Sequence, residues 1–188
     1  WSEGGAYVHN LFAGEIATHS NDERLTPFHP AHSTAIAGLH RIPGGDDRYF
    51  NNVFAGRGDL SPYDPATLPV RMSGNVFLKG AKPSKSEAQP LCRPEFDPAL
   101  RLVERADGFY LEMTFDKAWS AGQPRTLVTT GFLGKAVVPN ASYEQPDGSP
   151  IRIATDYLGT RREKGNPFPG PFELSKEGTQ ALKVRSAS

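Results

Sequence analysis

Asn52-Val53-Phe54-Ala55-Gly56 recurs with small changes as Asn10-Leu11-Phe12-Ala13-Gly14 and as Asn75-Val76-Phe77-Leu78-Lys79-Gly80, and this repeat decides the fold. The last two copies start 23 residues apart, close to one coil of a parallel β-helix, in which each coil stacks on the next. The first two start 42 residues apart, which fits one coil with an insertion. Each Asn precedes an apolar strand, so we expect the Asn side chains to hydrogen-bond backbone groups in the turns. Unrelated β-hairpins that share Asn and Gly are the alternative.

The insertion in the first coil is predicted to be a loop spanning residues 18–46. A long loop within a regular repeat is more often functional than decorative, because surface loops carry sites on a rigid scaffold. Titratable side chains are concentrated in and just before this loop, since all five histidines of the chain fall in its first 40 residues: His9, His19, His29, His32 and His40.

The second part of the chain has a different pattern. Strict alternation over residues 109–115, after a turn at Asp107-Gly108 and an expected strand at 100–104, predicts an antiparallel hairpin. Further strands are expected at 126–130 and 151–153, and a short helix within 116–121. The fold class is therefore all-β: residues 1–82 form coils of a parallel β-helix with the inserted loop 18–46, and residues 83–188 form an antiparallel β-rich region.

Composition excludes some classes of partner. The chain has 21 basic and 21 acidic residues without long runs of one sign, so it offers no basic stripe for nucleic acid and no polybasic membrane anchor. No apolar run reaches the roughly 18 residues that span a bilayer. The lone Cys92 cannot form an internal disulfide and is expected to be buried as a small apolar residue. Nothing in the sequence decides between the bacterial cytoplasm and secretion.

The doublet Asp46-Asp47, followed by Arg48, is the densest polar cluster. Glycosidases flank the scissile bond with two carboxyl groups about 5–5.5 Å apart for retention or about 6.5–9.5 Å apart for inversion. Adjacent residues in an extended chain point to opposite faces, so at most one of the two aspartates faces a given ligand. The alternative is structural: Asp46 turns the chain, and Asp47 pairs with Arg48 or Arg57.

The inserted segment adds His29, His32 and Arg24, a mixture of donors suited to hydroxyl-rich ligands. Histidines satisfied by loop carbonyls are the competing interpretation. A zinc site is not expected, because no third ligand follows at a diagnostic spacing. The candidate substrate-binding residues are thus Arg24, His29, His32, Asp46, Asp47 and Arg48. No residue is assigned as catalytic or as a metal ligand, and no cofactor is expected, with calcium the one ion left open.

Several longer segments carry a resemblance to a known family. They are 4–14, 26–34 (Thr-Pro-Phe-His-Pro-Ala-His-Ser-Thr), 45–52 (Gly-Asp-Asp-Arg-Tyr-Phe-Asn-Asn), 155–159 and 166–172 (Asn-Pro-Phe-Pro-Gly-Pro-Phe). Together they resemble the C-terminal part of the glycoside hydrolase family 120 β-xylosidases. The resemblance implies a right-handed parallel β-helix with an added β-sandwich, and release of xylose from the ends of xylooligosaccharides with retention of configuration.

The chain also departs from that family. The family's nucleophilic Asp and acid/base Glu lie in Trp-Leu-Asp-Trp and Glu-Val-Asn-His motifs upstream of the Gly4–Val8 segment, and neither motif occurs here. The resemblance therefore implies that this chain completes the sugar pocket, while a missing N-terminal part or partner chain supplies both carboxylates. An open first coil exposes strand edges, so an N-terminal polypeptide or an oligomer partner is expected to cover residues 1–12.

Two other functions remain open at this point. One is a non-catalytic carbohydrate-binding or structural β-helix module. The other is a polysaccharide lyase, which would use calcium and a basic residue such as Arg48 or Arg57. For the chain alone enzymatic activity is undecided; the complete protein is expected to be a glycoside hydrolase.

Overall fold

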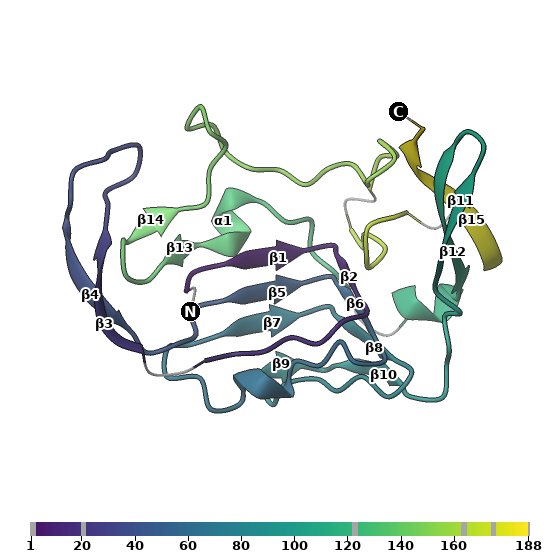
Figure 1. The fold of residues 1–188 in the computed structure, drawn as a ribbon, viewed down its shortest axis with the longest axis horizontal. Helices are drawn as coiled ribbons and strands as arrows, with labels where there is room; N and C mark the ends of the chain where they lie inside the picture. The colour runs from purple at the N-terminus through teal and green to yellow at the C-terminus, as the bar shows by residue number, and fades with distance from the viewer. Residues whose placement is uncertain (1–2, 20–21, 122–123, 163–164, 174–175, 188) are drawn as a thin grey trace.

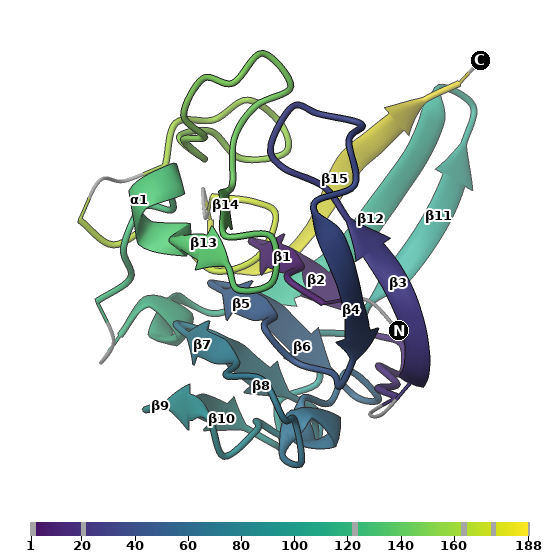
Figure 2. The same ribbon diagram turned by 90° about the vertical axis from the view of Figure 1, so that its left-hand side faces the viewer.

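Two parallel sheets form the centre of the computed structural model, which describes residues 3–19, 22–121, 124–162, 165–173 and 176–187 (Figure 1). The first sheet has the order β1 (Ala6–Val8), β5 (Arg48–Phe50), β7 (Arg71–Ser73) and β9 (Glu87–Ala88). The second has the order β2 (Leu11–Phe12), β6 (Val53–Ala55), β8 (Val76–Leu78) and β10 (Leu91–Arg93). Each coil of the chain supplies one strand to each sheet, and Figure 2 shows these pairs stacked in layers.

Equivalent residues of the repeat lie directly above one another. Phe12 is in register with Phe54, and Phe54 with Phe77. Their rings stack with centroids 4.9 Å and 5.1 Å apart. Phe54 and Phe77 are fully buried, so this row of rings is part of the core between the sheets. The three segments of the repeat are thus neighbouring parallel strands, as their spacing predicts.

The asparagines form a hydrogen-bonded ladder at the corner between the sheets. Asn10 N donates to Asn52 Oδ1 (2.8 Å), and Asn52 N donates to Asn75 Oδ1 (2.9 Å). The Asn52 and Asn75 amides donate to the carbonyls of Tyr7 and Tyr49. The prediction that these side chains bond backbone groups in the turns is confirmed.

The parallel pairing continues beyond Lys82, where the sequence placed a domain boundary. β9 pairs with β7 and β10 with β8, both in parallel. Glu87 takes the place of the next asparagine, since its two oxygens accept from Asn75 N (3.2 Å) and Nδ2 (2.6 Å). A search for repeated Asn does not find a carboxylate in this position, so the sequence pattern gave no sign of the parallel strands β9 and β10.

Cys92 on β10 is exposed, so the prediction of a buried side chain was wrong. Neighbouring Leu91 packs on the core. Successive strand residues point to opposite faces, and Cys92 therefore faces outward.

The insertion is an antiparallel hairpin rather than an irregular loop. It consists of β3 (Asp22–Phe28) and β4 (Gly38–Ile42), which project to one side of the parallel sheets (Figure 1). Three large apolar side chains on it are exposed: Leu25, Ile36 and Leu39.

An antiparallel sheet of β11 (Arg101–Arg105), β12 (Gly108–Phe115) and β15 (Gly178–Ser186) lies at the other side. The predicted hairpin around Asp107-Gly108 is confirmed as β11–β12. Met113 and Phe115 of β12 share one core cluster with Val53 and Val76 of the parallel strands. The two kinds of sheet are therefore joined by a common apolar core.

Short elements complete the fold. They are the 3-10 helices η1 (Ser61–Tyr63) and η2 (Lys117–Ser120), the helix α1 (Thr130–Leu133), and the paired strands β13 (Lys135–Ala136) and β14 (Ala141–Ser142). η2 lies within the range predicted for a helix, and Asp116 caps it by accepting from Ala118 N. Among the described residues, no helix has the length and apolar character needed to cross a membrane.

The strands predicted at 126–130 and 151–153 are absent, and an isolated bridge between Thr129 and Arg152 is what joins these segments. Thr129 Oγ1 accepts from Phe132 N (3.2 Å). This N-cap starts α1 at Thr130, within the range 126–130 that was predicted to be a strand.

Candidate functional site

Asp46 and Arg48 are buried together and hold the chain in place. Asp46 Oδ1 lies 2.6 Å from Arg48 Nη1, and Asp46 Oδ2 accepts from Val137 N (2.6 Å). Arg48 also donates from Nε to Leu133 O (3.1 Å). With both side chains almost fully enclosed and satisfied, this pair anchors the segment after α1 to the start of β5. It is Asp46, not Asp47, that pairs with Arg48.

Asp47 faces a different part of the molecule. Its Oδ1 accepts from Gly5 N (2.8 Å), and the residue is 2% exposed. Burial, the largest influence, raises the pKa of this carboxyl above its ordinary value, while the hydrogen bond from Gly5 opposes the rise. The two aspartates thus have different partners, although Asp46, with φ +58°, is not in the extended conformation on which the expected alternation rests.

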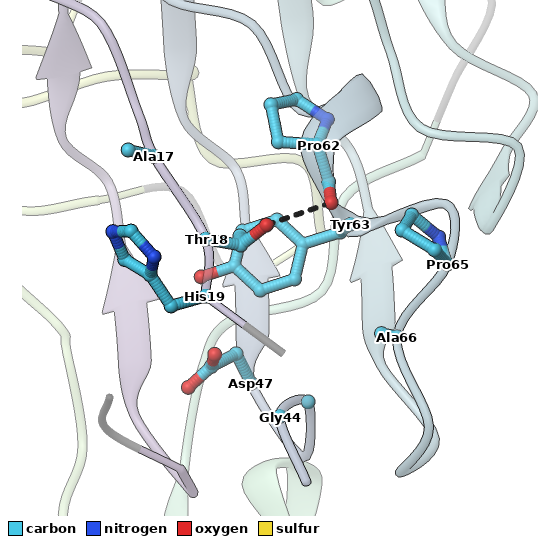
Figure 3. Close-up of a pocket in the computed structure, with 10 residues that line it drawn as sticks. Ala17, Thr18, His19, Gly44, Asp47, Pro62, Tyr63, Pro65 and Ala66 are labelled. Carbon is cyan, nitrogen blue, oxygen red and sulfur yellow. Dashed lines mark hydrogen bonds between the residues drawn. The ribbon is translucent and has the colours of Figure 1, made fainter. Parts of the chain in front are cut away.

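A small cavity of about 50 Å³ lies beside Asp47 (Figure 3). Three chain segments enclose it: the one after β2, the one before β5, and the η1 turn, with Thr18 Oγ1 donating to Pro62 O (2.9 Å) across it. Its lining residues are Ala17, Thr18, His19, Gly44, Gly45, Asp47, Pro62, Tyr63, Pro65 and Ala66. Polar groups from segments far apart in sequence thus converge around one carboxylate.

A larger, open groove of about 450 Å³ adjoins this cavity, because Ala17 and Tyr63 line both. Tyr7, Phe12 and Tyr49 give the groove an aromatic wall, in which the rings of Tyr7 and Tyr49 stack at 4.6 Å. The Tyr49 and Tyr63 hydroxyls lie 2.9 Å apart. Burial raises the pKa of both phenols, which stay neutral as donors and acceptors.

The arrangement provides groups of the kind that bind a sugar. Aromatic faces beside hydroxyl and carboxylate groups match a ligand that alternates C–H and O–H groups. Asp47 is the carboxylate of the small cavity, and Glu15 at the groove is exposed and paired with Arg57 (2.5 Å).

The remaining predicted residues lie on the projecting hairpin. His29 Nδ1 is 3.0 Å from Ala35 O, and His32 Nε2 is 2.9 Å from Glu144 Oε2. Arg24 is an exposed residue of β3. None of these three lines the cavity at Asp47 or the aromatic groove. Of the six candidates, Asp47 is the one that the structure places in a cavity of this site.

Sequence reasoning missed Thr18 and Tyr63, which belong to no motif, and it did not count Tyr49, which directly follows Arg48, among the substrate-binding residues. Within the described ranges, no group of three His, Cys, Asp or Glu side chains is placed to hold a metal ion.

Comparisons with known proteins give one structural match to report. No family model and no curated protein matches the sequence. A solved structure of XylC in complex with xylose matches with a TM-score of 0.86 and 29% sequence identity. The match covers 97% of this chain and 33% of that chain, so this chain spans about a third of the length of the protein it resembles. The chain is therefore related in fold and in sequence to part of a protein whose structure was solved with xylose.

Proposed function

We propose that this chain is the C-terminal portion of a retaining glycoside hydrolase of the family 120 β-xylosidase type, acting on xylooligosaccharides. The observation that carries the proposal is the match to XylC with xylose over nearly the whole chain. In this proposal the parallel strands are the last coils of a right-handed β-helix. The catalytic carboxylates lie on a polypeptide outside residues 1–188, and this chain completes the sugar pocket.

Asp47 and the aromatic groove are the parts of the pocket that this chain contributes. The Asp47 carboxylate accepts hydrogen bonds from sugar hydroxyls, and Tyr63 can donate or accept beside it. Tyr7 and Phe12 offer ring faces to the C–H groups of a pyranose. Asp46 and Arg48 act on the pocket through the backbone that they fix, because their side chains are already paired.

Kinetics of the complete protein on an aryl β-xyloside test this assignment. Asp47→Asn keeps an oxygen for Gly5 N but removes the charge, so we expect KM to rise about 10- to 100-fold, the loss typical of a hydrogen bond to a charged group. Asp97→Asn is the control, because Asp97 is exposed and pairs with Lys79 on the surface. Unchanged kinetics for Asp47→Asn would show that Asp47 is not part of the sugar pocket. Turnover by residues 1–188 alone would refute the proposal that the catalytic carboxylates lie on another polypeptide.

We also propose that an N-terminal polypeptide, or an oligomer partner, covers residues 1–12. β1 and β2 occupy the edges of the two parallel sheets in the described part of the chain. The aromatic row ends there with Phe12, which is partly buried, whereas Phe54 is fully enclosed. A further coil stacked on this edge would bury the same ring faces that the lower coils bury.

A non-catalytic sugar-binding module is the second candidate, favoured by the lone carboxylate of the small cavity. It predicts xylose binding without turnover by any assembly that contains this chain. The polysaccharide lyase hypothesis is not favoured, because both arginines that it would use as the basic residue are already in ion pairs. Arg48 is buried with Asp46, and Arg57 pairs with Glu15.

A further inference from the structure

The hairpin of β3 and β4 carries three of the seven large apolar side chains that are exposed among the described residues: Leu25 (57%), Ile36 (66%) and Leu39 (58%). A hairpin of two strands is at best marginally stable in water unless it packs against something else. Exposed apolar side chains gathered in one place are typical of surfaces that bind another polypeptide. The hairpin is therefore the strongest candidate for an interaction surface outside the proposed sugar pocket.

One face of the hairpin is already occupied by the rest of the molecule. Phe28, His40 and Ile42 line a cavity of about 240 Å³ together with residues of the β13–β14 connection. Leu39 lies next to His40 in β4 and does not line this cavity, because successive strand residues point to opposite faces. Leu25 is also absent from its lining. The hairpin thus has apolar side chains on both faces, and the structure covers one of them.

The hairpin is held in position at both ends. Near its tip, His32 Nε2 lies 2.9 Å from Glu144 Oε2 of the segment that follows β14. At its base, Gly44 N donates to Glu3 Oε1 (2.8 Å), two residues after β4 ends. These contacts tie the hairpin to distant parts of the chain, so its exposed side chains are presented on a positioned element.

The hairpin also extends past the end of the parallel stack (Figures 1 and 2). β1 is the outermost strand of its sheet in the described part of the chain, and the hairpin tip lies beyond it, on the side where a further coil would stack. In the proposed function, an N-terminal polypeptide leads into this chain and reaches Glu3, which contacts the base of the hairpin. A segment tethered so closely has a high effective concentration at the hairpin.

The structural comparison favours the same occupant. The match covers 33% of the XylC chain, so the larger part of that related protein lies outside the region that this chain resembles. A second copy of this chain could instead add a strand to the hairpin. However, β3 contains Pro27, which has no N–H to donate, and proline in an edge strand discourages such pairing.

We propose that Leu25, Ile36 and Leu39 form a docking surface for the N-terminal polypeptide of the same protein. This inference rests on the proposed function, in which that polypeptide carries the catalytic carboxylates. It adds a contact separate from the covering of residues 1–12, because the docking surface lies on the inserted hairpin.

Cysteine labelling of the complete protein tests whether the surface is covered. Leu39→Cys and Leu102→Cys are compared in a Cys92→Ser background, since Cys92 is the one cysteine of this chain. Leu102 is the matched control, because it is 68% exposed on β11 at the other side of the parallel sheets. We expect a maleimide to modify position 39 at least tenfold more slowly than position 102, as followed by mass spectrometry of the peptides. Equal rates would overturn the proposal.

Photo-crosslinking then identifies the occupant. With p-benzoylphenylalanine in place of Ile36, irradiation of the complete protein should link position 36 to a peptide of the same chain that precedes residue 1. Cross-links between two copies, or none at all, would also overturn the proposal. Turnover of an aryl β-xyloside separates this inference from the proposed function. Rapid labelling of position 39 with turnover retained refutes the docking surface alone, whereas a complete parent protein without turnover refutes the proposed function, whatever the labelling rate.

Discussion

Glu87 is the residue whose ionisation is expected to affect stability most directly. Its pKa is raised by burial from an ordinary value of 4.5 to about 7. The folded state therefore holds a proton that the unfolded chain releases, and this contribution is complete below pH 4.5 and lost as the pH rises towards 7. The shift corresponds to at most about 3 kcal/mol.

The Glu87→Gln variant should remove this dependence. The difference in free energy of unfolding between the parent protein and this variant, measured by urea denaturation at several pH values, should decline as the pH rises from 4.5 to 7. His9, with a pKa lowered to about 3, gives an opposite slope in both proteins, because its contribution is lost as the pH falls below 6.5. Glu104→Gln, an exposed control, should keep the parent profile; identical profiles for parent and Glu87→Gln would contradict the assignment.

The aspartate doublet illustrates how far the sequence leads at the residue scale. Strand alternation predicted that one carboxylate at most would face a ligand, and Asp47 alone of the two lines a cavity, but the left-handed backbone of Asp46 (φ +58°) lies outside that argument. Which of them pairs with Arg48 could not be predicted, because the choice depends on Val137 N and Gly5 N, brought in from distant segments.

Among the elements, the asparagine ladder is the feature that holds successive coils in register. Asn75 is fully buried and serves Asn52, Tyr49 and Glu87 at once. Asn75→Ala leaves several of these groups without partners, so we expect a loss of about 2–4 kcal/mol in the free energy of unfolding. Asn10→Ala is the matched control at the exposed end of the ladder and should cost less than about 1 kcal/mol. Equal losses for the two variants in urea denaturation would argue against the ladder.

Periodic elements were predictable and irregular ones were not. The parallel strands and the β11–β12 hairpin follow from spacing and alternation, which are properties of the local sequence. The projecting hairpin and α1 depend on particular contacts. Thr129 caps α1, and Glu87 ends the ladder without repeating the Asn that marks the other coils.

For the whole molecule, the edge formed by β1 and β2 predicts association. Residues 1–188 produced alone should self-associate through this edge, as measured by light scattering after gel filtration, unless the proposed N-terminal polypeptide is present. Ala6→Lys places a charge at an exposed position of β1 and should shift the protein towards the monomer. Ala181→Lys makes the same change on β15, at the edge of the antiparallel sheet, and should not. A monodisperse parent monomer would refute the proposed covering of residues 1–12.

Asn52 and Asn75 occupy equivalent positions in two stacked layers, so the 23 residues from one to the next correspond to one layer of the scaffold. Loss of residues 52–74 would join Asn51 to Asn75, and Val76 would then follow the corner as Val53 does now. The shortened chain would be one layer, about 4.8 Å, thinner, with the alternation of inward and outward side chains unchanged. Genes for such scaffolds can therefore gain or lose whole layers by in-frame duplication or deletion of 23 codons, whereas the gain or loss of one codon within a strand would turn its core residues outward.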